Sequence, residues 1–140
     1  MTMVLVDSSA WIEGLRRRGN LEVKLALEAL LDAYAIILCS PVRLEVLGGA
    51  RTSDRNRLSY YFSIIPYRAC EADDWERAVA LAWQLRDQGI TVPWMDVLIA
   101  AIALHDGTRV YAVDEHFMAI SKVTGLPLYE PGYGGAFKPA

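Results

Sequence analysis

A chain of 140 residues has the usual size of one domain and can bury a core without disulfides or structural metal. Although 54% of the residues are hydrophobic, charges interrupt every apolar run before the roughly eighteen residues that a membrane span needs, so we expect no membrane segment. The net charge of −3 neither requires nor excludes nucleic acid, and the opening residues lack a secretory pattern, which favours the cytoplasm.

The chain opens with a predicted strand followed by two helices. Residues 3–6 form an apolar run that ends at Asp7, which predicts a buried strand and then a helix beginning near Ala10. Residues 21–34 place leucines and alanines among charged residues in an amphipathic pattern, which predicts the second helix. Asp7 is therefore expected at the end of the first strand.

A second strand with its own helix follows. The apolar run 35–39 predicts the strand, and Ser40 and Pro41 suit the N-cap and the first position of a helix. This helix would carry Glu45 and end at the glycine pair 48–49. Glu45 is then expected about one helical turn beyond the second strand.

The middle of the chain contains three predicted helices and one strand. Residues 52–62 read as a helix, and 64–67 as a short edge strand, since a proline is tolerated at the edge of a sheet but not in a central strand. A long helix is expected over 71–88. The helix over 93–104 has almost no polar residue on any face, which predicts burial on all sides.

The last part of the chain completes the alternation. Residues 109–113 predict a strand that ends before Asp114, and a helix follows near 117–122. Residues 127–129 predict a last strand. Residues 131–140 are rich in glycine and proline, and we expect a loose tail there.

Strands that alternate with helices and read as continuous apolar runs indicate a parallel sheet covered on both faces. We therefore predict an α/β fold, a three-layer α/β/α sandwich with a central, mostly parallel sheet. We expect it to form a single domain over residues 1–130, followed by the Gly/Pro-rich C-terminal tail 131–140.

Four acids fall where such a sheet collects ligands, beyond the carboxyl ends of its strands. Asp7 and Asp114 each follow a strand directly, and Asp96 lies in the first turn of the buried helix. Glu45 can reach the same edge. Taken singly, helix capping explains Asp7 and Asp114 about as well, and solvent exposure explains Glu45. Asp96 alone would complement the dipole of its helix.

Taken together, the four carboxylates would repel one another and raise their pKa values, so a positive group is expected between them. A hard dication such as Mg2+ or Mn2+ binds carboxylate oxygens and keeps several waters, which suits a site built from acids. Zinc is disfavoured because His105 and His116 show no ligand spacing. Arginines cluster at 16–18 and 43–57, although a solvated charged face explains any single one.

Four motifs carry this arrangement. Residues 4–12 are an apolar strand running into Asp and a hydroxyl residue, and 40–46 place an acid on a helix after Ser-Pro. Residues 92–107 are an acid leading an apolar helix that ends at glycine, and 110–117 are a strand ending in Asp. With these motifs, over nearly its whole length, the chain resembles the PIN-domain ribonucleases and, within them, the VapC-type toxins of bacterial toxin–antitoxin pairs.

The resemblance implies a metal-dependent endoribonuclease that hydrolyses RNA phosphodiesters by metal-activated water and leaves a 5′-phosphate and a 3′-hydroxyl. It implies that Asp7, Asp96 and Asp114 hold Mg2+, with Mn2+ as an alternative. Glu45 would complete the catalytic set, either as a ligand or by orienting the water.

The residues beside these acids include two departures from the family pattern. Many relatives have threonine at the place of Ala112 and a further aspartate at the place of His116. Glu115 could substitute, but its neighbouring position on the helix points elsewhere, so Asp114 remains the expected ligand. Ser8 and Ser9 would support the site by hydrogen bonding, and helix capping explains either serine equally well.

The resemblance also implies partners. Relatives are inhibited by a small cognate antitoxin that lays apolar segments across the toxin and can place an arginine in the acidic pocket. The apolar excess of this chain fits such a partner or a homodimer. Core packing explains each candidate contact residue as well: Trp11, Leu15, Tyr60, Tyr61, Phe62 and Trp83.

Two other functions compete with this interpretation. Haloacid-dehalogenase-like phosphatases also place an aspartate after the first strand, but they need a second aspartate where this chain has Ser9. A catalytically silent PIN-like module that only binds RNA or a partner is the rival of a different class, and Ala112 and His116 favour it. Metal-dependent turnover would separate the nuclease from the silent module.

Overall fold

The computed structural model describes residues 3–139 and contains a four-stranded sheet in the order β3-β2-β1-β4, with every pairing parallel. Val4 lies opposite both Ile36 and Arg109, so β1 is a central strand. The predicted parallel sheet is confirmed. The strands are β1 (Val4–Val6), β2 (Ile36–Cys39), β3 (Tyr67–Arg68) and β4 (Arg109–Tyr111).

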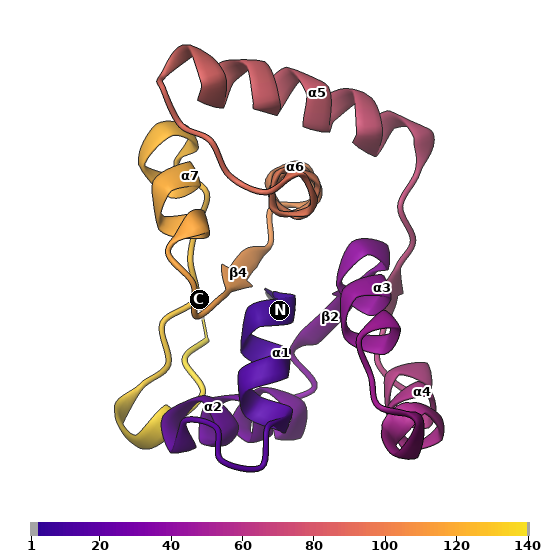
Figure 1. Ribbon diagram of the computed structural model, residues 1–140. Coiled ribbons are helices and arrows are strands. Elements are labelled where there is room, and N and C mark those ends of the chain that lie inside the picture. The colour runs from indigo at the N-terminus through magenta and orange to yellow at the C-terminus, as the bar shows by residue number, and fades with distance from the viewer. Residues whose placement is uncertain (1–2, 140) are drawn as a thin grey trace.

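Helices cover both faces of this sheet, with α5 and α6 on one side and α1 and α2 on the other in the view of Figure 1. This is the predicted α/β/α arrangement. No helix within residues 3–139 is both long and apolar enough to span a membrane. The helices are α1 (Ser8–Leu15), α2 (Leu21–Asp32), α3 (Ser40–Gly48), α4 (Arg55–Ser63), α5 (Ala72–Asp87), α6 (Trp94–Asp106) and α7 (His116–Thr124), with 3-10 turns η1 (Thr52–Asp54) and η2 (Tyr133–Gly135).

The core is centred on β1 and α6. All three residues of β1 are buried, as a strand between two helical layers requires. On α6, every residue from 96 to 103 is buried, so the predicted burial on all sides is confirmed there, whereas Trp94 at the start of the helix is exposed. The helix ends at Gly107, whose φ of 70° is in the left-handed region that favours glycine. This buried helix fixes the position of its first turn, which carries Asp96.

The predicted role of Ser40 as an N-cap is wrong. The N-cap of α3 is Cys39, and Ser40 is already inside the helix. Its hydroxyl accepts a hydrogen bond from the backbone N–H of Cys70 at 2.8 Å and lies 2.7 Å from the Tyr67 hydroxyl. Ser40 therefore holds the short edge strand β3 in place, a contact across 27 residues that no local pattern predicts.

The C-terminal segment is not the loose tail that its composition suggested. Gly135 has a φ of 83°, and a Cβ atom there would lie only 2.8 Å from the backbone nitrogen of Ala26, so α2 and the segment pack backbone to backbone. The Tyr129 hydroxyl accepts a hydrogen bond from the backbone of Lys138 at 3.1 Å, and its ring stacks on Phe137. Three residues of the predicted domain and tail (1, 2 and 140) lie outside the described part.

Candidate metal centre

Asp7 lies between β1 and α1, where it uses its two carboxylate oxygens differently. Oδ2 accepts hydrogen bonds from the backbone N–H of Ser9 at 3.0 Å and from the Ser9 hydroxyl at 2.6 Å, so Asp7 does cap α1. Oδ1 is buried and has no hydrogen-bond partner among residues 3–139. Because a buried, unsatisfied carboxylate oxygen is costly, capping alone does not account for Asp7.

Ser8 and Ser9 connect this carboxylate to two other parts of the chain. The Ser8 hydroxyl donates to Oε1 of Glu45 at 2.8 Å and so joins α1 to α3. The Ser9 hydroxyl accepts from the backbone N–H of Val113 at 3.1 Å while it donates to Asp7. The strand end that carries Asp7 is thereby tied both to Glu45 and to the loop after β4.

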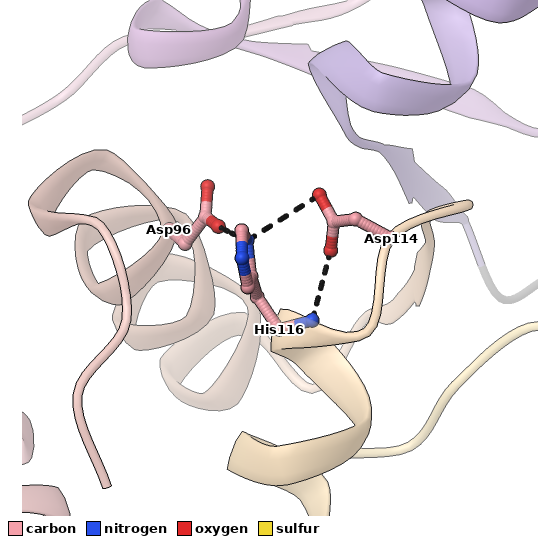
Figure 2. A group of neighbouring side chains, drawn as sticks. All are labelled: Asp96, Asp114 and His116. Atoms are coloured by element: carbon pink, nitrogen blue, oxygen red, sulfur yellow. Dashed lines mark hydrogen bonds and ion pairs between the residues drawn. The ribbon is translucent and has the colours of Figure 1, made fainter.

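Asp96, Asp114 and His116 form a close group, drawn in Figure 2. Nδ1 of His116 lies 2.7 Å from Oδ2 of Asp96 and 3.7 Å from Oδ2 of Asp114. Oδ1 of Asp114 accepts a hydrogen bond from the backbone N–H of His116 at 3.1 Å. One ligand atom from each residue lies within 4.8 Å of the other two, close enough to share one metal ion.

The carboxylates of this site influence one another. Burial raises the pKa of Asp96 to about 6, and the nearby charges of Asp7 and Asp114 add to the rise, while the hydrogen bond from His116 opposes it. Burial also raises the pKa of Asp7; its Ser9 hydrogen bonds oppose this, and the charge of Asp114 reinforces it. The charges of Asp7, Asp96 and Asp114 thus act on one another, while the group of ligand atoms that lie within 4.8 Å of each other consists of Asp96, Asp114 and His116.

The residues present fit a divalent cation. Three carboxylates that repel one another and a buried oxygen without a partner are relieved by a positive ion among them. Carboxylate oxygens are the ligands that Mg2+ and Mn2+ prefer, and an imidazole nitrogen adds a donor that first-row transition-metal ions bind more readily than Mg2+ does. Glu45 is brought only as far as Ser8 and remains exposed. Of the four predicted acids, Glu45 is the most exposed to solvent.

Sequence reasoning missed His116 as a member of the site. It lacks the spacing of a zinc motif, but it follows Asp114 by two residues at the start of α7, and that turn directs its ring toward Asp96. The sequence feature that could have identified His116 is its position two residues after Asp114, the acid that follows strand β4. Glu115, by contrast, is exposed at the N-cap of α7.

Comparisons with known proteins agree with this architecture. A solved complex, VapBC2 from Rickettsia felis bound to a DNA fragment from its promoter, matches with a TM-score of 0.73 at 17% identity, over 91% of this chain and 97% of that one. A toxin–antitoxin complex from Klebsiella pneumoniae matches with a TM-score of 0.64 at 21% identity, over 98% of both chains. At such identities, these two structures support the fold.

Similarity in sequence is stronger and extends over most of the chain. Ribonuclease VapC11 of Mycobacterium tuberculosis is 32% identical over 130 residues, which cover 89% of this chain and 96% of that protein. The family model described as PIN domain matches residues 4–123, a span that includes every acid of the site. The chain therefore belongs to the PIN-domain family, alongside the VapC ribonucleases.

Proposed function

We propose that this protein is a divalent-cation-dependent endoribonuclease, and that Asp7, Asp96 and Asp114 hold the cation. The observation that carries the proposal is that carboxylate oxygens of Asp96 and Asp114 lie within 4.8 Å of each other and the charge of Asp7 acts on Asp96. A buried oxygen of Asp7, which has no hydrogen-bond partner within residues 3–139, supports it. The ribonuclease names of the sequence relatives support RNA as the substrate. Mg2+ is the proposed ion, with Mn2+ as the alternative.

Each residue has a defined task in this proposal. When bound, a divalent cation supplies an acidified water and offsets negative charge on the phosphoryl oxygens. Ser9 holds one oxygen of Asp7 and so directs the other into the site. Ser8 fixes Oε1 of Glu45, and this carboxylate orients the attacking water and accepts its proton.

RNA also needs a positive surface, because the acids themselves repel phosphates. A groove of about 620 Å3 lies between the end of α1, the end of α3 and the start of α4. We call it the arginine groove, after the five arginines that line it: Arg16, Arg17, Arg18, Arg51 and Arg57. Within residues 3–139, no salt bridge engages Arg17, Arg18 or Arg51. These three guanidinium groups are available to phosphates.

The arginine groove and the acids are joined by the same helices. Helix α1 begins beside Asp7 and its eight residues extend about 12 Å to the groove. On α3, Val46 lines the groove directly after Glu45. We propose that single-stranded RNA with its scissile phosphate at the acids places neighbouring phosphates on the arginines.

The biological role that we propose is the toxin of a toxin–antitoxin pair, acting in the cytoplasm with a cognate antitoxin protein as partner. The structural neighbour from Klebsiella pneumoniae, a toxin–antitoxin complex, supports this role. A homodimer is also proposed; the exposed indoles of Trp75, Trp83 and Trp94 beside a groove between α5 and α6 supply apolar surface for it. Expression in a bacterial cell should arrest growth, and a small adjacent gene should relieve the arrest.

The deciding experiment measures cleavage by the purified, antitoxin-free protein. Labelled RNA should be cut with Mg2+ or Mn2+, and EDTA should stop the reaction. Asp96→Asn should lose at least about 100-fold in rate, because a ligand and its charge are removed. Equal activity in Asp96→Asn would refute the site. RNA binding without cation-dependent turnover would favour the silent PIN-like module instead.

A further inference from the structure

His116 contributes a nitrogen to a site otherwise built from acids. Its Nδ1 lies 2.7 Å from Oδ2 of Asp96 and 3.7 Å from Oδ2 of Asp114 (Figure 2). Neighbouring ligand atoms around a cation with bonds of about 2.1–2.2 Å lie about 3 Å apart, and opposite ones about 4.3 Å. The 2.7 Å contact is a hydrogen bond with Asp96, and both separations are also short enough for these atoms to share one ion.

The backbone holds the ring in this position. His116 is the first residue of α7, and its N–H donates to Oδ1 of Asp114 at 3.1 Å, so the imidazole and this carboxylate are oriented together. The ring is partly exposed, with 44% of the side chain accessible. With a cation in place of the hydrogen-bonded proton, Nε2 would carry the ring proton and donate it to water, and the lone pair of Nδ1 would be free to bind the ion.

A second, independent observation marks a ligand position here. Oδ1 of Asp7 is buried without a hydrogen-bond partner, and the charges of Asp7 and Asp114 act on each other and on Asp96. A hydrogen bond between His116 and Asp96 satisfies neither Asp7 nor Asp114. A cation bound by Asp96, Asp114 and His116 would offset the charge of both acids and of the neighbouring Asp7.

We propose that Nδ1 of His116 is a direct metal ligand and that it makes the site selective for Mn2+ over Mg2+. Imidazole binds first-row transition-metal ions well, whereas Mg2+ takes oxygen ligands and retains its water. The inference rests on the proposed function only in that the acid cluster holds the cation of the nuclease. Neither RNA nor turnover enters its test.

Calorimetry on EDTA-treated, re-purified protein gives the dissociation constants of Mn2+ and Mg2+ without RNA. We expect Mn2+ to bind at least about tenfold more tightly than Mg2+, and His116→Gln to lose about tenfold or more in Mn2+ affinity while Mg2+ binding changes little. His116→Asp should bring the two constants closer together. The matched control is His105→Gln, at the exposed end of α6, which should leave both constants unchanged.

Pulsed electron paramagnetic resonance of the Mn2+ complex reports the ligand directly. A 14N coupling of directly bound imidazole should appear in the natural protein and in His105→Gln, and it should be absent from His116→Gln and His116→Asp. The spectrum of the natural protein decides the question even where a variant does not fold. Absence of the 14N coupling from the natural protein, or an unchanged Mn2+:Mg2+ ratio in a folded His116→Gln, overturns the proposal.

The test also separates this inference from the proposed function. A protein that shows the 14N coupling but cuts no RNA keeps His116 as a ligand and loses the nuclease. A protein that cuts RNA and binds Mn2+ without the coupling remains a nuclease, with His116 only hydrogen-bonded to Asp96. A protein that binds no Mn2+ overturns the inference outright.

Discussion

Asp96 has a pKa that burial and neighbouring charges raise well above the ordinary value of an aspartate. Its pKa of about 6 exceeds its ordinary value of 3.8, so the folded protein favours the neutral form. The destabilisation from its charge is absent below pH 3.8, grows as the pH rises toward 6 and is complete above that value. At neutral pH, the charge of Asp96 therefore lowers the free energy of unfolding of the metal-free protein.

Asp96→Asn should consequently stabilise the metal-free protein at pH 8, by about 1–3 kcal/mol, and the gain should vanish near pH 4. The measurement is urea unfolding in EDTA at both pH values. Asp87→Asn, at an exposed acid of α5, is the matched control and should change little at either pH. A variant less stable than the natural protein at pH 8 would contradict the electrostatic account.

The sequence predicted part of the site, and the limit has a physical reason. Asp7 and Asp114 follow strand ends, and the carboxyl ends of parallel strands meet at one edge, so their proximity follows from topology. The contribution of His116 depends on the direction in which α7 leaves the loop, which tertiary packing determines. The link from Ser8 to Glu45 spans 37 residues and depends on how α1 packs on α3.

At the scale of elements, edge strand β3 is held to two helices by one arginine. Arg68 bonds Asp74 of α5 at 2.6 Å and Asp106 of α6 at 2.8 Å. Asp74 is fully buried and also accepts from Arg77 and from the backbone of Glu71. The hydrogen bonds from Arg68 lower the pKa of Asp74 to about 2, although burial opposes this.

Asp74→Ala should destabilise the protein by about 2–4 kcal/mol, because it leaves the partly buried guanidinium of Arg68 without its main partner. The pKa of Asp74 is depressed in the fold, so its contribution is present above pH 3.8 and is lost as the pH falls toward 2. Urea unfolding at pH 7 measures the loss. Asp73→Ala, an exposed neighbour in the same helical turn, should cost far less; equal losses would remove the special role of Asp74.

The arginine groove gives a second prediction at this scale. Replacing Arg17, Arg18 and Arg51 together by Gln should weaken binding of single-stranded RNA and reduce the slope of log affinity against log salt by about 0.7 for each phosphate that is no longer neutralised. Fluorescence anisotropy at several salt concentrations, in the Asp96→Asn background, measures both. Arg86→Gln on α5 is the control. If the triple variant kept the salt slope of RNA binding but bound a protein partner more weakly, the groove would be a binding surface for that partner.

Element boundaries were predicted well where burial patterns are strong and poorly where the packing partner is distant in sequence. Helix α6 was expected over 93–104 and runs over Trp94–Asp106, because its apolar residues leave few alternatives. The last expected strand, 127–129, is reduced to a single bridge between Val110 and Leu128. The C-terminal turn at Gly135 was missed because its partner, α2, lies about a hundred residues earlier.

At the scale of the whole molecule, the candidate site exists only in the folded chain. Asp7, Asp96 and Asp114 come from the end of β1, the start of α6 and the loop after β4. An unfolded chain cannot gather them, so a cation binds the native state alone. Cation binding is therefore linked to folding.

Adding Mn2+ at 100 times its dissociation constant should stabilise the protein by about 2.7 kcal/mol. Thermal unfolding at increasing Mn2+ should show a rising midpoint in the natural protein and a nearly constant one in Asp96→Asn. The effect should reverse on addition of EDTA. A midpoint that rises equally in both proteins would mean that the ion binds elsewhere.

The two oxygens of the Asp7 carboxylate have different roles, and this affects how such a protein can evolve. One oxygen caps α1, and the other, which has no hydrogen-bond partner within residues 3–139, is the one that we propose binds the ion. Asparagine caps helices as well as aspartate does, so Asp7→Asn would preserve the fold while removing a ligand charge. A single substitution can thus turn a nuclease of this kind into an inert but still folded descendant that keeps its partners.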